Sequence, residues 1–148
     1  MDTFADFFNT LIGEWSLSRA ISTGEQMEGS LVFSRMDSSN LQANEVGDMR
    51  MASGNVISAT RQWIWRIGDA GLQIYFDEDP PRLYHQVKPV ARAGAWHGEG
   101  HHDCQPDTYV GDYLFSDNKI IIKQDVLGPN KDYQIISEYQ RMKPTGAK

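Results

Sequence analysis

The sequence predicts an all-β fold, a closed up-and-down antiparallel barrel of about ten strands with a short N-terminal helix. From Gly13 onward, apolar and polar residues alternate with the two-residue period of half-buried strands. Short turn signals such as Asp117-Asn118 separate these segments and leave no room for crossover helices, so neighbouring strands should pair antiparallel. A meander of this length hides its unpaired edges by closing on itself.

The first segment, residues 1–12, is expected to contain the helix. Its apolar side chains recur at spacings of three, four and one, which predicts a stripe along one helical face. The stripe consists of Phe4, Phe7, Phe8, Leu11 and Ile12. Thr3 or Asp2 would cap the helix, and Gly13 ends the helical period.

The barrel is expected over residues 13–142, within a single domain of residues 1–148 that ends in a frayed tail at 143–148. No change in composition and no repeat marks a second domain. The candidate strands are residues 14–22, 27–36, 40–50, 56–67, 71–77, 82–89, 94–104, 107–116, 119–127 and 131–142.

The last candidate strand indicates which residues face the barrel interior. Its even positions, such as Asp132 and Glu138, carry mostly solvent-type side chains, so its odd positions should point inward. The same reasoning places a mixed polar and aromatic set inside the other strands. The expected inner residues include Lys131, Tyr133, Tyr139, Arg141, Trp15, Leu17, Arg19, Ile21, Glu45, Gly47, Arg61, Trp63, Trp65, Ile67, Tyr109, Gly111, Tyr113 and Phe115.

The composition narrows the possible partners and the cellular location. A net charge of -6 argues against nucleic acid or an anionic membrane as the main partner, because both require clustered Lys and Arg. The two aspartates near the start are unlike an export signal, and no apolar stretch is long enough for a membrane helix. A single cysteine, Cys104, excludes an intrachain disulfide, so we expect a cytoplasmic protein.

The junction between the helix and the first strand reads Leu11-Ile12-Gly13-Glu14-Trp15. Its Gly-x-Trp motif resembles the one that opens lipocalins, fatty-acid-binding proteins and their relatives, the calycins. In those barrels the Trp lies across the closed end and an Arg of the last strand stacks on it. The resemblance therefore implies a lipocalin-like barrel in which Gly13, Trp15 and Arg141 close one end.

A wider set of motifs resembles an uncharacterised family, domain of unknown function 6314, which is found in bacterial proteins and attached to some fungal ones. The motifs are Gly13-x-Trp15-x-Leu17-x-Arg19, Gly29-x-x-x-Phe33, Glu45-x-Gly47, Arg61-x-Trp63-x-Trp65, Phe76, Tyr84-His85, His102-x-Cys104-x-x-Asp107-x-Tyr109-x-Gly111-x-Tyr113, Gly128-Pro129-Asn130-Lys131-Asp132-Tyr133 and Tyr139-x-Arg141. The family pattern has an aromatic residue where Gln124 stands and a Tyr where Leu41 stands. The resemblance implies the fold but no established activity.

The inward polar set suggests a pocket for a small ligand. Arg61 or Lys131 would hold an anionic group while tyrosine hydroxyls orient an aromatic or apolar body. The expected ligand-binding residues are Arg61, Trp65, His85, His102, Tyr109, Tyr113, Lys131 and Tyr133. The alternative is a filled core whose charges pair, for example Glu45 with Arg61 or Arg19. Ten strands enclose more volume than side chains easily fill, which favours a cavity.

The stretch from His97 to Cys104 contains three histidines and the cysteine. At about 3.3 Å per residue, His97 and His101 would lie roughly 13 Å apart on one strand, so we expect no metal site. Cys104 and His102 are separated by roughly 7 Å at the backbone, which is long for a nucleophile and its base. His85 or His102 could ligate haem, but the glycine-rich signature of nitrobindin-like barrels is missing, and we expect no cofactor.

Three functional classes therefore stay open. The first is binding of a small, anionic or partly aromatic metabolite inside the barrel. The second is a cofactor-free enzyme of the isomerase, cyclase or decarboxylase type, with Glu45, His102 or Cys104 as candidate catalytic residues. The third is a structural or interaction domain, in which an outward stripe of Trp63 and Trp65 would meet a partner or a second copy in a homodimer.

Overall fold

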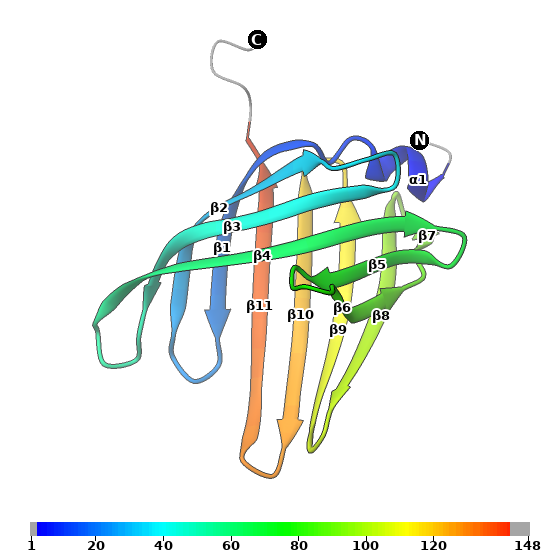
Figure 1. Cartoon of the computed structure of the whole chain (residues 1–148). Coiled ribbons are helices and arrows are strands. Elements are labelled where there is room, and N and C mark those ends of the chain that lie inside the picture. Colours follow the sequence, from blue (N-terminus) through cyan, green and yellow to red (C-terminus); the bar gives the residue numbers. More distant parts are fainter. Residues whose placement is uncertain (1–2, 143–148) are drawn as a thin grey trace.

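The computed structural model describes residues 3–142, which form one curled antiparallel sheet with a short helix at one end (Figure 1). The elements are α1 (Phe4–Phe8), β1 (Gly13–Ile21), β2 (Gln26–Arg35), β3 (Asn40–Arg50), β4 (Val56–Gly68), β5 (Gly71–Phe76), β6 (Arg82–Val87), β7 (Val90–Arg92), β8 (Ala95–Cys104), β9 (Asp107–Ser116), β10 (Lys119–Gly128) and β11 (Lys131–Arg141). The expected cap at Asp2 and the tail at 143–148 lie outside the described residues.

The described strands form a single meander in the order β6-β5-β4-β3-β2-β1-β11-β10-β9-β8-β7. Neighbouring strands pair antiparallel, so the predicted all-β meander is confirmed. The structure has eleven strands rather than about ten, and the additional one is β7, which follows Pro89 directly. Proline has no N–H to donate, so β6 does not run on as one hydrogen-bonded strand through this point.

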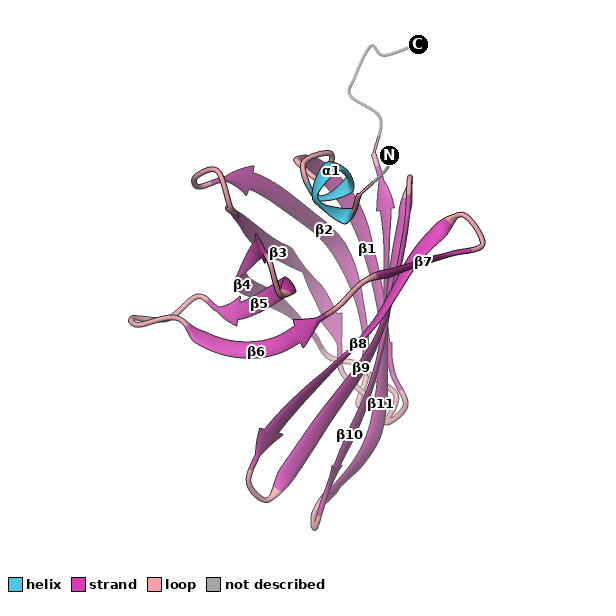
Figure 2. Ribbon diagram, turned by 90° about the vertical axis from the view of Figure 1, so that its right-hand side faces the viewer, coloured by secondary structure: helices cyan, strands magenta, loops and turns pink. Residues whose placement is uncertain are grey.

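The predicted closure of the barrel is wrong, because the end strands β6 and β7 are not hydrogen-bonded to each other in the part of the chain that the structure describes. The sheet instead curls into an open half-barrel in which β6 lies beside β8 (Figure 2). Glycines allow this close approach: a Cβ on Gly100 would stand 2.6 Å from His85 Cγ, and one on Gly98 would meet Val87. Side-chain packing, rather than backbone hydrogen bonds, therefore joins β6 to β8.

The predicted alternation of inner and outer residues is present in the strands. In β11 the odd-numbered residues are buried or half-buried and the even-numbered ones are exposed. In β4, Trp65 is buried and Trp63 is half-buried. The expectation that these two tryptophans could form an outward stripe for a partner is therefore wrong, because both side chains belong to the interior.

The helix α1 is shorter than the expected segment. Thr3 caps it, since its Oγ1 accepts a hydrogen bond from the Asp6 amide at 3.1 Å. Leu11 is fully buried although it lies beyond the helix, whereas Ile12 is 43% exposed and leaves the predicted apolar stripe. Within residues 3–142, no helix is long and apolar enough to cross a membrane.

The end of the half-barrel next to α1 is closed by aromatic packing. Gly13 has a φ of +129°, which favours glycine, and the chain turns there into β1 so that Trp15 points inward. The fully buried Trp15 donates from its Nε1 to the Leu11 carbonyl at 2.9 Å. Arg141 lies over the indole with Cζ 4.3 Å from the ring centroid and donates to the carbonyls of Thr10 and Asp117.

Candidate functional site

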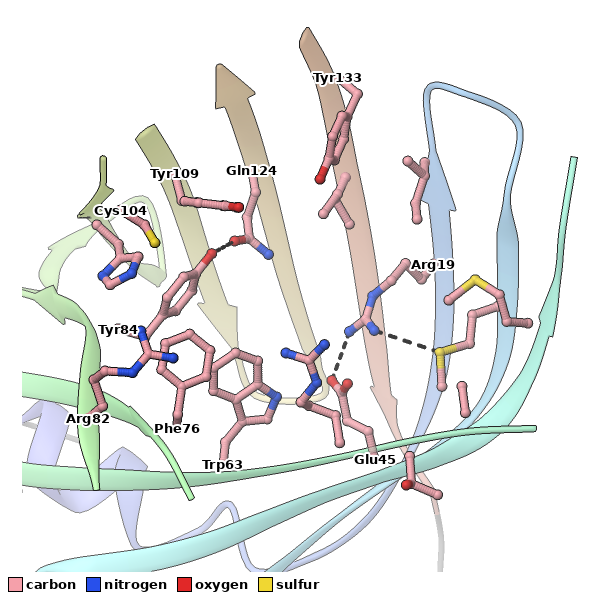
Figure 3. A pocket seen from close by; sticks show the side chains of 18 residues that line it. Arg19, Glu45, Trp63, Phe76, Arg82, Tyr84, Cys104, Tyr109, Gln124 and Tyr133 are labelled. Carbon is pink, nitrogen blue, oxygen red and sulfur yellow. Dashed lines mark hydrogen bonds and ion pairs between the residues drawn. The ribbon is translucent and has the colours of Figure 1, made fainter. Parts of the chain in front are cut away.

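The interior of the half-barrel contains a cavity of about 450 Å³, which is within the size range of small-molecule sites (Figure 3). Its lining residues come from strands on both sides of the curl. On β9 and β11 they include Tyr109 and Tyr133, which lie near the strand ends far from α1. The cavity therefore occupies the end of the fold opposite the aromatic closure.

One wall of this cavity is aromatic. Trp63 on β4, Phe76 on β5 and Tyr84 on β6 contact one another with ring centroids 5.0 to 5.3 Å apart. His102 on β8 extends the wall at 5.1 Å from the Tyr84 ring. Figure 3 shows Trp63, Phe76 and Tyr84 side by side, with Gln124 at the Tyr84 hydroxyl. A planar apolar body would stack against this wall.

Tyr84 reaches the cavity because β6 carries a β-bulge. Ile74 pairs with His85 and Tyr75 pairs with Leu83, so Tyr84 is the additional residue between the two pairs. One extra residue changes the parity of the strand, which turns both Tyr84 and His85 inward. Strict alternation places only one of two adjacent residues inside, so the sequence-based reasoning singled out His85 and missed Tyr84 as a site residue.

His85 was expected to contact the ligand, but it is fully buried behind Tyr84, with the two rings stacked at 3.9 Å. Its Nε2–H donates to the Tyr109 carbonyl at 3.2 Å, and its Nδ1 therefore accepts from the Tyr113 hydroxyl at 2.5 Å. Burial lowers the pKa of His85 to about 4, so the ring is neutral at pH 7. Neither ring nitrogen is left for a ligand or for haem iron.

The carboxylate of Glu45, which is 3% exposed, is already paired inside the protein. Its Oε2 accepts from Arg19 Nη2 at 2.8 Å and from the Tyr139 hydroxyl at 2.5 Å. Burial alone would lower the pKa of Arg19, but Tyr139 and Glu45 outweigh it and hold that pKa above its ordinary value. Of the two partners considered from the sequence, Glu45 thus pairs with Arg19 and not with Arg61.

Because Glu45 pairs with Arg19, Arg61 has no carboxylate partner among the described residues. Its guanidinium lines the cavity with Cζ 5.4 Å from the Trp63 ring centroid, and no ion pair or side-chain hydrogen bond joins it to another residue within 3–142. Arg82, which sequence reasoning missed, also lines the cavity but pairs with Glu78 at 3.2 Å and lies over the Phe76 ring. The local charge around Arg61 is therefore positive although the whole chain is acidic.

Lys131 stands at the rim, and the lining of the cavity does not include it. Its Nζ forms an ion pair with Asp107 at 2.9 Å and donates to the Tyr109 hydroxyl at 3.0 Å. These two partners, Tyr109 first, raise the pKa of Lys131 above its ordinary value. The amine is therefore engaged within the protein and is a weaker candidate for an anionic group than Arg61.

Two other expected ligand-binding residues, Trp65 and Tyr113, lie deeper. They line a separate space of about 40 Å³ below the main cavity, and Arg19, Glu45 and Tyr84 line both spaces. Trp63 and Gln124 also line both spaces, so the floor of the main cavity consists of the Arg19–Glu45 ion pair and these three side chains of β4, β6 and β10.

The candidate catalytic residues are placed in the same region. His102 and Cys104 both line the cavity from β8, but no hydrogen bond joins them among the described side chains. Burial, followed by the charge of Arg82, lowers the pKa of His102. Residues 3–142 contain no group of three or more His, Cys, Asp or Glu side chains that could hold a metal ion.

The curled antiparallel sheet, its aromatic closure and its internal cavity define a lipocalin-like barrel that is left open at one seam. The chain belongs to the Family of unknown function (DUF6314), whose family model matches residues 11–141. This match confirms the resemblance to domain of unknown function 6314 that was noted in the sequence. No curated protein matches the chain.

Solved structures with a similar fold include the S-type phycobiliprotein lyase CPES from Guillardia theta, at a TM-score of 0.59 and 9% identity. This match covers 97% of the present chain and 94% of the lyase. A redesigned β-barrel, mFAP0 bound to DFHBI, matches at a TM-score of 0.48 and 12% identity, over 89% of this chain and 99% of the design. At such identities the similarity concerns the fold alone.

Proposed function

We propose that this chain binds a small, partly aromatic molecule with an anionic group in the cavity of the half-barrel. The observation that carries the proposal is Arg61, a cation without a partner of its own in residues 3–142, beside a wall of aromatic rings. Arg61 is exposed, so its guanidinium is open to an anion, and charge-assisted hydrogen bonds are about twice as strong as neutral ones. The aromatic wall would bury the rest of the molecule.

Binding is favoured over catalysis by the state of the acid and base candidates. Glu45 already serves Arg19 and Tyr139, and no hydrogen bond within the described residues links His102 to a nucleophile. We therefore propose that the chain is a cytoplasmic binding protein with a small-molecule partner, and that it does not catalyse a reaction.

Native mass spectrometry can test this proposal with a variant that fills the cavity. Ala59 lines the cavity, so Ala59→Trp would occupy part of its volume, whereas Ala20→Trp would add the same side chain to the exposed outer face of β1. After incubation with a cell extract, the wild-type protein and Ala20→Trp are expected to retain a small molecule that Ala59→Trp does not. Equal retention by all three proteins, or none by any, would contradict the proposal.

A further inference from the structure

We infer that the ligand is a planar aromatic carboxylate, an inference that rests on the proposed function and specifies its chemical class. The inference follows from the hydrogen-bond donors and acceptors of the lining side chains that have no partner within the described protein. Each type of side chain carries a fixed number of donors and acceptors, so the unpaired ones indicate which polar group of a ligand fits the cavity.

Three of the groups left free offer donors. Tyr84 donates its hydroxyl hydrogen to Gln124 Oε1, which leaves the amide nitrogen of Gln124 with two N–H groups and no acceptor in residues 3–142. Figure 3 shows this nitrogen turned away from Tyr84. The Tyr109 oxygen accepts from Lys131, so its own hydrogen is left to donate. Arg61 adds the N–H groups of its guanidinium, which cannot accept.

Two of the acceptor oxygens in the lining, in contrast, are already engaged. Glu45 Oε2 receives hydrogen bonds from both Arg19 and Tyr139, and the Gln124 oxygen receives one from Tyr84. A ligand ammonium group would meet the positive charge of Arg61, while the negative charge of Glu45 is already offset by Arg19. The donors of Arg61, Gln124 and Tyr109 therefore favour a ligand whose polar end accepts hydrogen bonds.

The charge and geometry then favour a carboxylate over a phosphate. Arg61 is the arginine of this lining whose charge is not offset, since Arg19 pairs with Glu45 and Arg82 with Glu78. A single positive charge matches a monoanion, and the planar guanidinium fork matches the two oxygens of a carboxylate. A phosphate dianion would bring one negative charge more than the cavity offsets.

The position of Arg61 relative to the aromatic wall sets the shape of the rest of the molecule. Its guanidinium carbon is 5.4 Å from the Trp63 ring, and Trp63 contacts Phe76 and Tyr84. A carboxylate held by Arg61 thus places the atoms bonded to it directly against these rings. The carboxyl group is therefore attached to the ring or separated from it by a very short link.

A matched pair of probes tests this class, namely 2-naphthoate and its uncharged analogue 2-naphthamide. Isothermal titration calorimetry at pH 7 should show the naphthoate binding to the wild-type protein about tenfold more tightly than the amide. Arg61→Met should reduce this preference to less than about threefold. Arg66→Met, on the exposed outer face of the same strand, should preserve it.

The alternative outcomes separate the two claims. Equal affinity of the wild-type protein for both probes, or a tenfold preference that survives in Arg61→Met, would overturn the carboxylate inference and the role of Arg61 in the proposed function, but not the binding of a small molecule in the cavity. Tighter binding of 2-naphthyl phosphate than of 2-naphthoate would overturn it as well, because the cavity would then prefer a dianion. No binding of either naphthyl probe would also reject this class, and the retention experiment with Ala59→Trp decides separately whether the cavity binds any ligand.

Discussion

The two ends of the half-barrel are built from the same alternating strands but use their inner residues differently. At the end next to α1, Trp15 and Phe33 are fully buried with ring centroids 6.3 Å apart, and Phe33 packs on Trp65 at 4.9 Å. At the other end, the inner residues surround a cavity, and Trp63 is only half-buried. Packing is tight around Trp15 and Phe33, whereas the opposite end contains the cavity of about 450 Å³.

The polar groups follow the same division. At the closed end Trp15 Nε1 and the Arg141 guanidinium all find backbone carbonyl partners. At the open end the Arg61 guanidinium and the Gln124 amide nitrogen have no acceptor in the described chain. The comparison indicates that the closed end contributes most of the stability. The open end instead has polar groups that are available to bind a ligand.

The largest expected effect distinguishes the two ends by stability. Trp15→Ala should lower the free energy of unfolding by about 3 to 5 kcal/mol, because it removes a fully buried ring from a filled core. Trp63→Ala should cost clearly less, since that ring is half-buried against a cavity. Urea denaturation of both variants measures the difference, and equal losses would show that stability is not concentrated at the closed end.

The next expected effect concerns pH, at the seam where β6 meets β8. The folded protein holds the pKa of His85 at about 4 by burial, against about 6.5 in an unfolded chain. Above pH 6.5 the ring is neutral in both states, so it adds no pH dependence. Below that value the unfolded chain binds a proton that the folded protein does not, and stability falls until about pH 4, by about 3 kcal/mol in total.

The measurement is the difference in unfolding free energy between the wild-type protein and His85→Gln at pH 7.5 and at pH 4.5. The advantage of the wild-type protein should shrink by about 2 to 3 kcal/mol at the lower pH. Tyr84, Tyr109 and Tyr113 surround the ring, and the nearby His102 would repel its charged form. A constant advantage at both pH values would mean that folding does not shift the pKa of His85.

Sequence reasoning succeeded where a strand keeps its two-residue period without interruption. The even positions of β11 are polar except for Ile136, which placed Tyr133 and Tyr139 inside, and the structure has them there. The same rule placed Glu45 inside on β3. It could not choose the partner of Glu45, because Arg19 and Arg61 are both inward and their side-chain reach depends on the curvature of the sheet.

The bulge in β6 and the open seam could not be read from the pattern. A bulge is a single extra residue opposite a partner strand, so it appears only when the register between β5 and β6 is known. Closure likewise depends on whether two strands distant in the sheet order meet, and alternation carries no information on that. The glycines at 98, 100 and 111 were the available signal, since each faces a residue of β6, either Val87 or His85.

A smaller effect is expected from adding a single methyl group at the seam. Gly100→Ala should lower the free energy of unfolding by about 2 kcal/mol, because the new Cβ would stand 2.6 Å from His85 Cγ and force the ring or the strand to shift. Gly68→Ala is the matched control, since nothing lies within 4 Å of the added atom. If both variants unfold at the same urea concentration, His85 does not pack on β8 as closely as the structure shows.

The smallest of these effects returns to the closed end and concerns the geometry of one cation. Arg141→Lys keeps the charge over Trp15 but loses the planar fork that donates to the carbonyls of Thr10 and Asp117. We expect a loss of about 1 kcal/mol in urea denaturation, because part of the cation–π contact survives while the carbonyls lose their donors. Arg66→Lys, on the outer face of β4, should leave stability unchanged. An equal effect in the two variants would mean that Arg141 acts only as a surface charge, and the closed end would then depend on aromatic packing alone.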